Sequence, residues 1–148
     1  MDHNKGRSCT YVLKGEPEAL CLRRSDDTIG WSNFKERKLV TDITFESQHG
    51  DKPLFSKAVH IDFVFYFSIA TNVRCKDKSK GGDSYAKKPA LLPLLNFIDH
   101  AAVGRVYTDS CIWAHMTCKR FYDDEPRTII TITELYEKKD NTRKKAQE

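Results

Sequence analysis

Apolar and polar residues alternate most regularly between residues 59 and 67. Val59, Ile61, Phe63, Phe65 and Phe67 fall on one side of an extended chain, and the intervening residues fall on the other. A strict period of two with many aromatic residues is typical of a strand with one buried face. The pattern therefore predicts a strand over residues 59–67 whose five apolar side chains enter the core.

Shorter alternating stretches predict three more strands. Residues 10–14 alternate and then meet Gly15 and Pro17, which predict a turn. Residues 112–122 and 128–136 flank the sequence Asp-Asp-Glu-Pro-Arg, and the second of them alternates Thr with Ile, both residues of high β-propensity. We expect these last two segments to be strands joined by that short connection.

Two segments have the spacing of helices. In residues 32–45 the apolar residues Phe34, Leu39 and Ile43 are interspersed with charges, which indicates a helix despite several β-branched residues. A second helix is expected to begin near Pro93, a residue suited to a first helical turn, and to end at Gly104. Its predicted buried face comprises Leu94, Leu95, Ile98, Ala101 and Ala102.

The order of these elements is typical of an α+β domain with one mixed sheet. The chain has 148 residues, 39% apolar and 11% aromatic, which suffices for one core and excludes global disorder. We expect one domain over residues 10–136, a flexible N-terminus over 1–9 and a charged C-terminal tail over 137–148.

The net charge of +4 is modest, but one segment accounts for an equal excess. Residues 72–88 contain six basic and two acidic residues. Such a segment is either merely solvated or a contact for nucleic-acid phosphates. The basic residues are Arg74, Lys76, Lys78, Lys80, Lys87 and Lys88.

Other features point to a cytoplasmic protein without a built metal site. The chain has no apolar run of membrane-spanning length and no secretory signal, and its five cysteines follow no disulfide spacing. Cys111 and His115 share one face of a strand whereas Cys118 points to the other, so packing rather than zinc binding is expected. Asp99 and His100 are adjacent on a helix and do not converge as an acid–base pair.

Several segments in a fixed order resemble the RusA-like family of Holliday-junction resolvases. They are SQHGDKPLFSKAVHIDFVFYFSI, the lysine-rich segment, AKKP, the apolar helix, VGRVYTDS and DDEPRTIITI. The opening TYVLKGEP and the pair Arg23-Arg24 are similar to the family's first strand and basic turn. The resemblance covers about residues 10–136 and implies a small homodimer that binds four-way DNA junctions through Arg23, Arg24 and the basic segment.

The sequence departs from the family at the catalytic boxes. Lys88-Pro89 and Tyr107 match the family pattern, but Ala90 and Leu92 occupy the positions of two aspartates. The residues at the lysine position and in the second box are Asn96, Asp109 and Ser110, so Asp109 alone of four acidic positions remains. Magnesium requires several converging oxygen ligands, and one aspartate makes a vestigial metal site. Pro93 is also expected to keep Leu92 out of a helical conformation.

Three hypotheses follow. The first is a RusA-like homodimer that binds branched DNA without cleaving it and needs no cofactor, with Tyr85 or Trp31 stacking on opened bases. The second is an active magnesium-dependent junction endonuclease of DNA recombination or repair, which recruits carboxylates from Asp83, Asp109 and residues 123–125. The third is a scaffold co-opted as a protein-binding regulatory module.

Overall fold

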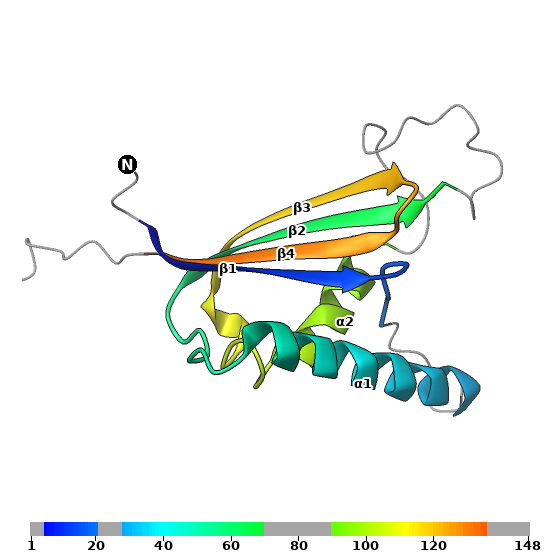
Figure 1. The fold of residues 1–148 in the computed structure, drawn as a ribbon, viewed down its shortest axis with the longest axis horizontal. Helices are drawn as coiled ribbons and strands as arrows, with labels where there is room; N and C mark the ends of the chain where they lie inside the picture. Colours follow the sequence, from blue (N-terminus) through cyan, green and yellow to red (C-terminus); the bar gives the residue numbers. More distant parts are fainter. Residues whose placement is uncertain (1–4, 21–27, 70–89, 136–148) are drawn as a thin grey trace, which may run out of the picture.

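The computed structural model describes residues 5–20, 28–69 and 90–135, with the side chains of residues 5 and 28–34 left aside (Figure 1). The elements follow in the predicted order, and together they form an α+β fold with a four-stranded mixed sheet and two helices. They are β1 (Lys5–Lys14), α1 (Thr28–His49), β2 (Val59–Ser68), α2 (Leu91–Ala102), the short 3-10 helix η1 (Ser110–Ile112), β3 (Trp113–Asp123) and β4 (Arg127–Leu135).

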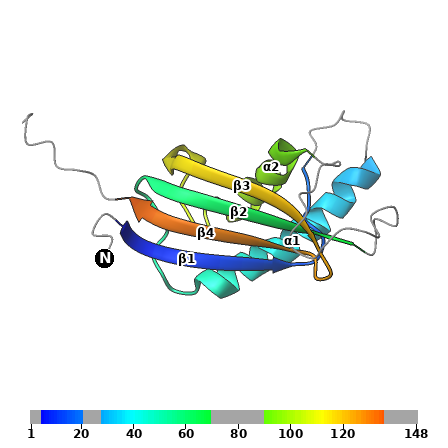
Figure 2. The same ribbon diagram turned by 90° about the horizontal axis from the view of Figure 1, so that it is seen from above.

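The sheet is mixed because two of its three strand pairings are antiparallel and the third is parallel. The strand order is β1-β4-β2-β3, as Figure 2 shows from above. β4 is antiparallel to both β1 and β2, whereas β2 and β3 are parallel. Parallel neighbours need a long crossover, and α2 lies in the connection between β2 and β3.

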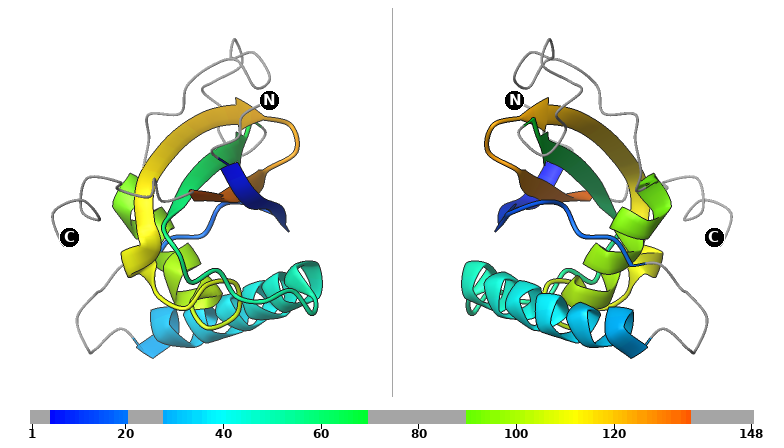
Figure 3. Two further views of the ribbon diagram at one scale, coloured as in Figure 1. Left: turned by 90° about the vertical axis from the view of Figure 1, so that its left-hand side faces the viewer. Right: turned by 90° about the vertical axis from the view of Figure 1, so that its right-hand side faces the viewer.

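Both helices pack against one face of the sheet, and the core lies between that face and the helices (Figures 1 and 3). The five alternating apolar residues of β2 are at most 3% exposed, which confirms the predicted inner face. Ile130 and Ile132 of β4 and Leu94 and Ala101 of α2 belong to the same core. Phe97 joins the predicted buried face of α2.

The N-terminal strand is longer than predicted. β1 begins at Lys5 instead of Thr10, so residues 5–9, expected in a flexible terminus, form part of the sheet. The reason is tertiary: Cys9 is buried, and Arg7 donates a hydrogen bond to the Pro53 carbonyl (2.6 Å) and pairs with Glu134 of β4 (3.4 Å). Distant residues therefore hold a segment whose local pattern is weak.

Both helices also begin earlier than predicted. α1 spans residues 28–49, and the hydroxyls of Thr41 and Thr44 donate to carbonyls four residues earlier. α2 begins at Leu91, so the expectation that Pro93 would keep Leu92 out of a helix is wrong. Proline is tolerated there because the N–H groups of a first helical turn have no intrahelical acceptor. After α2, Gly104 adopts a φ of +80° where the chain turns.

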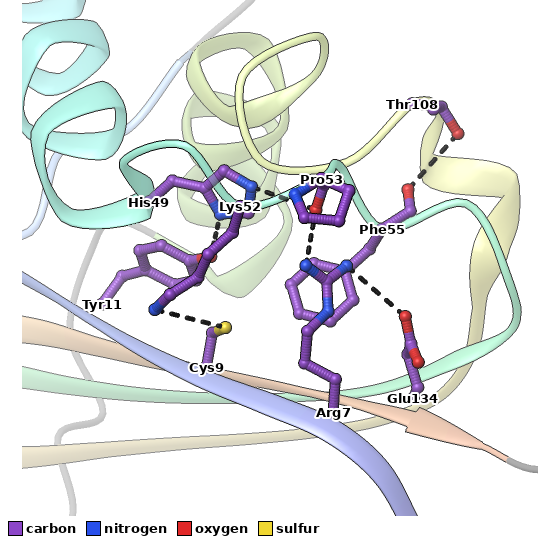
Figure 4. A network of polar contacts seen from close by, with 9 residues as sticks. All are labelled: Arg7, Cys9, Tyr11, His49, Lys52, Pro53, Phe55, Thr108 and Glu134. Atoms are coloured by element: carbon purple, nitrogen blue, oxygen red, sulfur yellow. Dashed lines mark hydrogen bonds and ion pairs between the residues drawn. The ribbon is translucent and has the colours of Figure 1, made fainter.

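A buried network of hydrogen bonds connects the C-terminal end of α1 to β1 (Figure 4). The Tyr11 hydroxyl lies 2.6 Å from His49 Nδ1, and His49 Nε2 lies 3.2 Å from the Pro53 carbonyl oxygen. This arrangement fits a neutral imidazole that accepts from Tyr11 and donates to Pro53. Burial raises the pKa of Tyr11 and lowers the pKa of His49.

The outer edge of β1 is covered at one point by a side chain. Gln48 of α1 accepts from the Val12 backbone N–H (2.8 Å) and donates to the Val12 carbonyl (2.7 Å). Unpaired backbone groups on an edge strand invite pairing with another chain, so Gln48 protects this edge. Within the described ranges, neither helix combines the length and apolar character that crossing a bilayer requires.

Candidate nucleic-acid interface

The two segments at the positions of the catalytic motifs in the resemblance lie at opposite ends of α2, and we call residues 90–93 the first box and residues 107–110 the second box. Ala90 is the N-cap of this 12-residue helix, whereas Tyr107 forms a β-bridge with Val103 just beyond its C-terminus. A helix of that length extends about 18 Å. Position 90 and Asp109 are therefore separated within one chain by the length of the helix.

The first box offers no ligand for a cation. Ala90 caps α2 without a side-chain hydrogen bond, and Leu92 is 66% exposed on the first turn. Asn96, which stands at the family's lysine position, is partly exposed one turn further along. An aliphatic side chain facing solvent supplies neither an oxygen for magnesium nor a charge for phosphate.

The second box has a structural role. Tyr107 is fully buried, and its hydroxyl donates to Asp99 Oδ1 at 2.6 Å. Asp109 is exposed, and its Oδ1 accepts from the backbone N–H of Cys111 (2.8 Å), so it caps η1, in which Ser110 is the first residue. That hydrogen bond lowers the pKa of Asp109, while burial and Asp99 raise the pKa of Tyr107. The one retained acidic position therefore serves as a helix cap.

The other candidate ligands do not gather either. In the described part of the chain, no three His, Cys, Asp or Glu side chains lie close enough together to hold a metal ion. Asp123, proposed as a recruited carboxylate, pairs with Arg127 at 2.5 Å, and this interaction lowers its pKa. Asp83 lies outside the described residues. The described carboxylates therefore do not form a magnesium centre.

The predicted cysteine and histidine set is dispersed. Cys111 is exposed in η1, not in a strand as predicted, whereas Cys118 packs against the core. His115 lies on the opposite face of β3 from Cys118 and makes an edge-on contact with His60 of β2, with ring centroids 6.2 Å apart. Asp109 raises the pKa of the Cys111 thiol.

The residues predicted to contact DNA lie outside the described ranges, as do Tyr85 and the side chain of Trp31. They are Arg23, Arg24, Arg74, Lys76, Lys78, Lys80, Lys87 and Lys88. The structure does describe where the basic segment joins the fold. Ile69 follows β2 and donates its backbone N–H to the Asp123 carbonyl (3.1 Å), and Ala90 precedes α2. Ile69, the last described residue before the basic segment, thus lies beside the turn between β3 and β4.

The same end of the sheet carries a row of side chains that the sequence did not reveal. Lys14 is paired in register with Arg127, Arg127 with Tyr66, and Tyr66 with Phe121. We call these four residues the cation–aromatic row. Alternation in β2 had placed Tyr66 away from the core, but its neighbours depend on sheet order and register, which no local pattern supplies.

Comparisons with known proteins assign no function to the cation–aromatic row or to the two boxes. No protein-family model matches the sequence, and no curated protein matches it. The likeness to RusA-like resolvases therefore rests on the order of the resembling segments in the sequence alone.

Proposed function

We propose that this protein binds branched DNA, four-way junctions above all, as a RusA-like domain that has lost metal-dependent cleavage. The observation that carries the proposal is that neither box supplies a set of metal ligands. Ala90 and Leu92 provide no oxygen ligand at one end of α2, and Asp109 caps η1 at the other. The observed order of strands and helices agrees with the order that the resemblance implies.

Loss of the metal separates cleavage from binding. A magnesium ion in a nuclease activates water and stabilises the charge that develops on the phosphate. Without it, cations can still neutralise phosphates and release counterions, which supplies much of the affinity for DNA. Residues 72–88 and Arg23-Arg24 retain this charge. A two-fold homodimer would present two such basic segments to a two-fold symmetric junction.

The test is a titration of the full chain with a labelled four-way junction and with a matched linear duplex. We expect junction binding with or without magnesium, no cleavage, and an affinity that falls steeply with salt. Changing Lys76, Lys78 and Lys80 to Gln should reduce the magnitude of the log–log salt slope by about 3. Absence of junction binding at low salt would overturn the proposal.

Asp109→Asn distinguishes a nuclease from a binding protein. We expect unchanged junction affinity, because Asn also caps helices and the position contributes no metal ligand. The variant and the wild type should both fail to cut the junction in magnesium or manganese. Cleavage by the wild type that Asp109→Asn abolishes would establish the active endonuclease instead.

A second candidate function, a protein-binding module, is favoured by the surface of α1. Leu39, Val40 and Ile43 are 60%, 65% and 57% exposed and lie on adjacent turns of this helix. Exposed apolar side chains that cluster in this way mark interaction surfaces. This function predicts a partner that is retained after complete nuclease digestion and is lost on Ile43→Asp, with Lys35→Asp as a control on the same helix.

A further inference from the structure

The cation–aromatic row lies on the face of the sheet that neither helix covers. Leu13, Phe65, Tyr122 and Thr128, which precede or follow its members in the chain, are directed to the core. Because side chains alternate along a strand, the row points the other way. Figures 1 and 3 show α1 and α2 together on the opposite face. The row therefore crosses all four strands on the outer face.

The planar groups of the row are held in place by one another. The Arg127 guanidinium lies 3.9 Å from the centroid of the Tyr66 ring, and the Tyr66 and Phe121 rings lie 5.9 Å apart with a tilt of 32°. Arg127 also donates to Asp123 Oδ2 (2.5 Å) and to the Glu125 carbonyl (2.8 Å). Arg127 thus lies over one face of the Tyr66 ring and Phe121 lies beside that ring, so the outer planes of the row are held in place and little side-chain entropy is left to lose on binding.

Two unpaired lysines flank these surfaces. Lys14 of β1 and Lys119 of β3 are exposed at the two edges of the sheet, and neither has an ion-pair partner among the described residues. Asp123, which contacts the row, is compensated by its ion pair with Arg127. The surface therefore combines aromatic and guanidinium planes with the positive charges of Lys14 and Lys119.

We infer that the cation–aromatic row is a binding site for the unpaired bases of single-stranded DNA, an inference that rests on the proposed function and adds the branch-point nucleotides to it. Every base has a face that stacks on aromatic rings or on an arginine plane, and lysines neutralise the phosphates between bases. Aromatic side chains on an open four-stranded sheet can stack two or three bases. An apolar protein partner fits less well because it would bury the charges of Lys14 and Lys119 without compensation.

The experiment compares two probes by fluorescence anisotropy, using the full chain. One probe is a 15-nucleotide oligothymidylate, and the other is an abasic deoxyribose-phosphate chain of the same length. Stacking predicts about tenfold tighter binding of the first, since the two probes carry equal charge. Phe121→Ala and Tyr66→Leu should abolish this preference, whereas Tyr66→Phe should keep it. The matched control is His115→Ala, at the far end of the same face, which should change nothing.

Lys119→Gln gives an independent readout should an aromatic variant fail to fold. It should weaken binding of both probes by the same factor and leave their ratio unchanged. A wild type with equal affinity for the two probes overturns the inference. The inference is also overturned if the wild type is a dimer that Phe121→Ala dissociates while oligothymidylate binding stays constant. The row would then contact a second copy of the chain.

The fully paired four-way junction separates this inference from the proposed function. If the wild type binds the junction but shows no preference for bases over the abasic chain, the inference alone fails. If it prefers bases and the aromatic variants lose that preference, yet the junction is not bound, the proposed function fails and the row is left as a general single-strand site.

Discussion

Two arginines of this fold lie over aromatic rings in nearly the same way. Arg7 lies 4.0 Å from the Phe55 ring centroid and Arg127 lies 3.9 Å from that of Tyr66. Each arginine also donates to one backbone carbonyl and one carboxylate. Their side chains are equally accessible, at 25% and 28%. The local chemistry of the two contacts is therefore the same.

The surroundings of the two arginines differ. Arg7 joins residues 46 and 127 positions away and covers the Phe55 ring (Figure 4), which is completely buried in the core. Arg127 joins residues two and four positions away and covers a partly exposed ring on the outer face. The Arg7–Phe55 contact joins distant segments of the fold, whereas the Arg127–Tyr66 contact orders side chains on the surface. Burial and sequence separation, not contact geometry, decide the role.

The largest expected contrast comes from removing the two rings. Phe55→Ala should lower the free energy of unfolding by about 3–5 kcal/mol, because it leaves a cavity in the core. Tyr66→Ala should cost less than about 1.5 kcal/mol, because water can fill the space at the outer face. Urea denaturation of both variants measures the difference. Equal losses would show that the outer face is buried in the native protein.

Removing the arginines should give a smaller contrast in the same direction. Arg7→Ala removes the partner of Glu134, one of the two donors to the Pro53 carbonyl and the cover of the Phe55 ring, and should cost about 1–3 kcal/mol. Arg127→Ala breaks a partly exposed local ion pair and should cost about 1 kcal/mol or less. Thermal unfolding at fixed pH provides the comparison, with Arg7→Lys as the charge-preserving control. A larger loss for Arg127→Ala would reverse the assignment of roles.

The stability of the fold around the Arg7–Phe55 contact should also depend on pH, because His49 lies next to it. Burial holds the pKa of His49 below its ordinary value of 6.5, so the unfolded chain binds the proton more readily. The stability associated with neutral His49 is fully present above about pH 6.5 and is lost as the pH falls below it. Unfolding measured between pH 7.5 and 5.5 should show this loss in the wild type and a flatter profile in His49→Gln. Identical slopes would assign the titration to another group.

Local pattern sufficed for much of the fold. The period of two in residues 59–67 identified a strand and its buried face, and the spacing of leucines and alanines after Pro93 identified the buried side of α2. It underestimated β1, because residues 5–9 are held by Arg7 and Cys9 through contacts with distant segments. It also misjudged Leu92, because Pro93 occupies a helical turn in which a missing N–H costs nothing.

For the candidate site, the sequence predicted which residue types are present but not how they are arranged. The sequence showed that Ala90 and Leu92 stand where the proposed resemblance to RusA-like resolvases would place aspartates. It did not show that Asp109 caps η1 or that Tyr107 is fastened to Asp99, because these contacts depend on how the chain turns after α2. Nor did it bring Lys14, Tyr66, Phe121 and Arg127 together, since they come from four different strands.

By itself, the sequence determined the kind and order of the secondary-structure elements, the apolar faces that form the core, and the nonacidic residues Ala90, Leu92 and Ser110. These properties follow from residue types and their spacing over a few turns or strands. The tertiary structure alone decided the strand order, the separation of the two boxes by α2, and the formation of the cation–aromatic row. Each depends on pairing between residues far apart in the chain, where register is fixed by the burial of a whole sheet face.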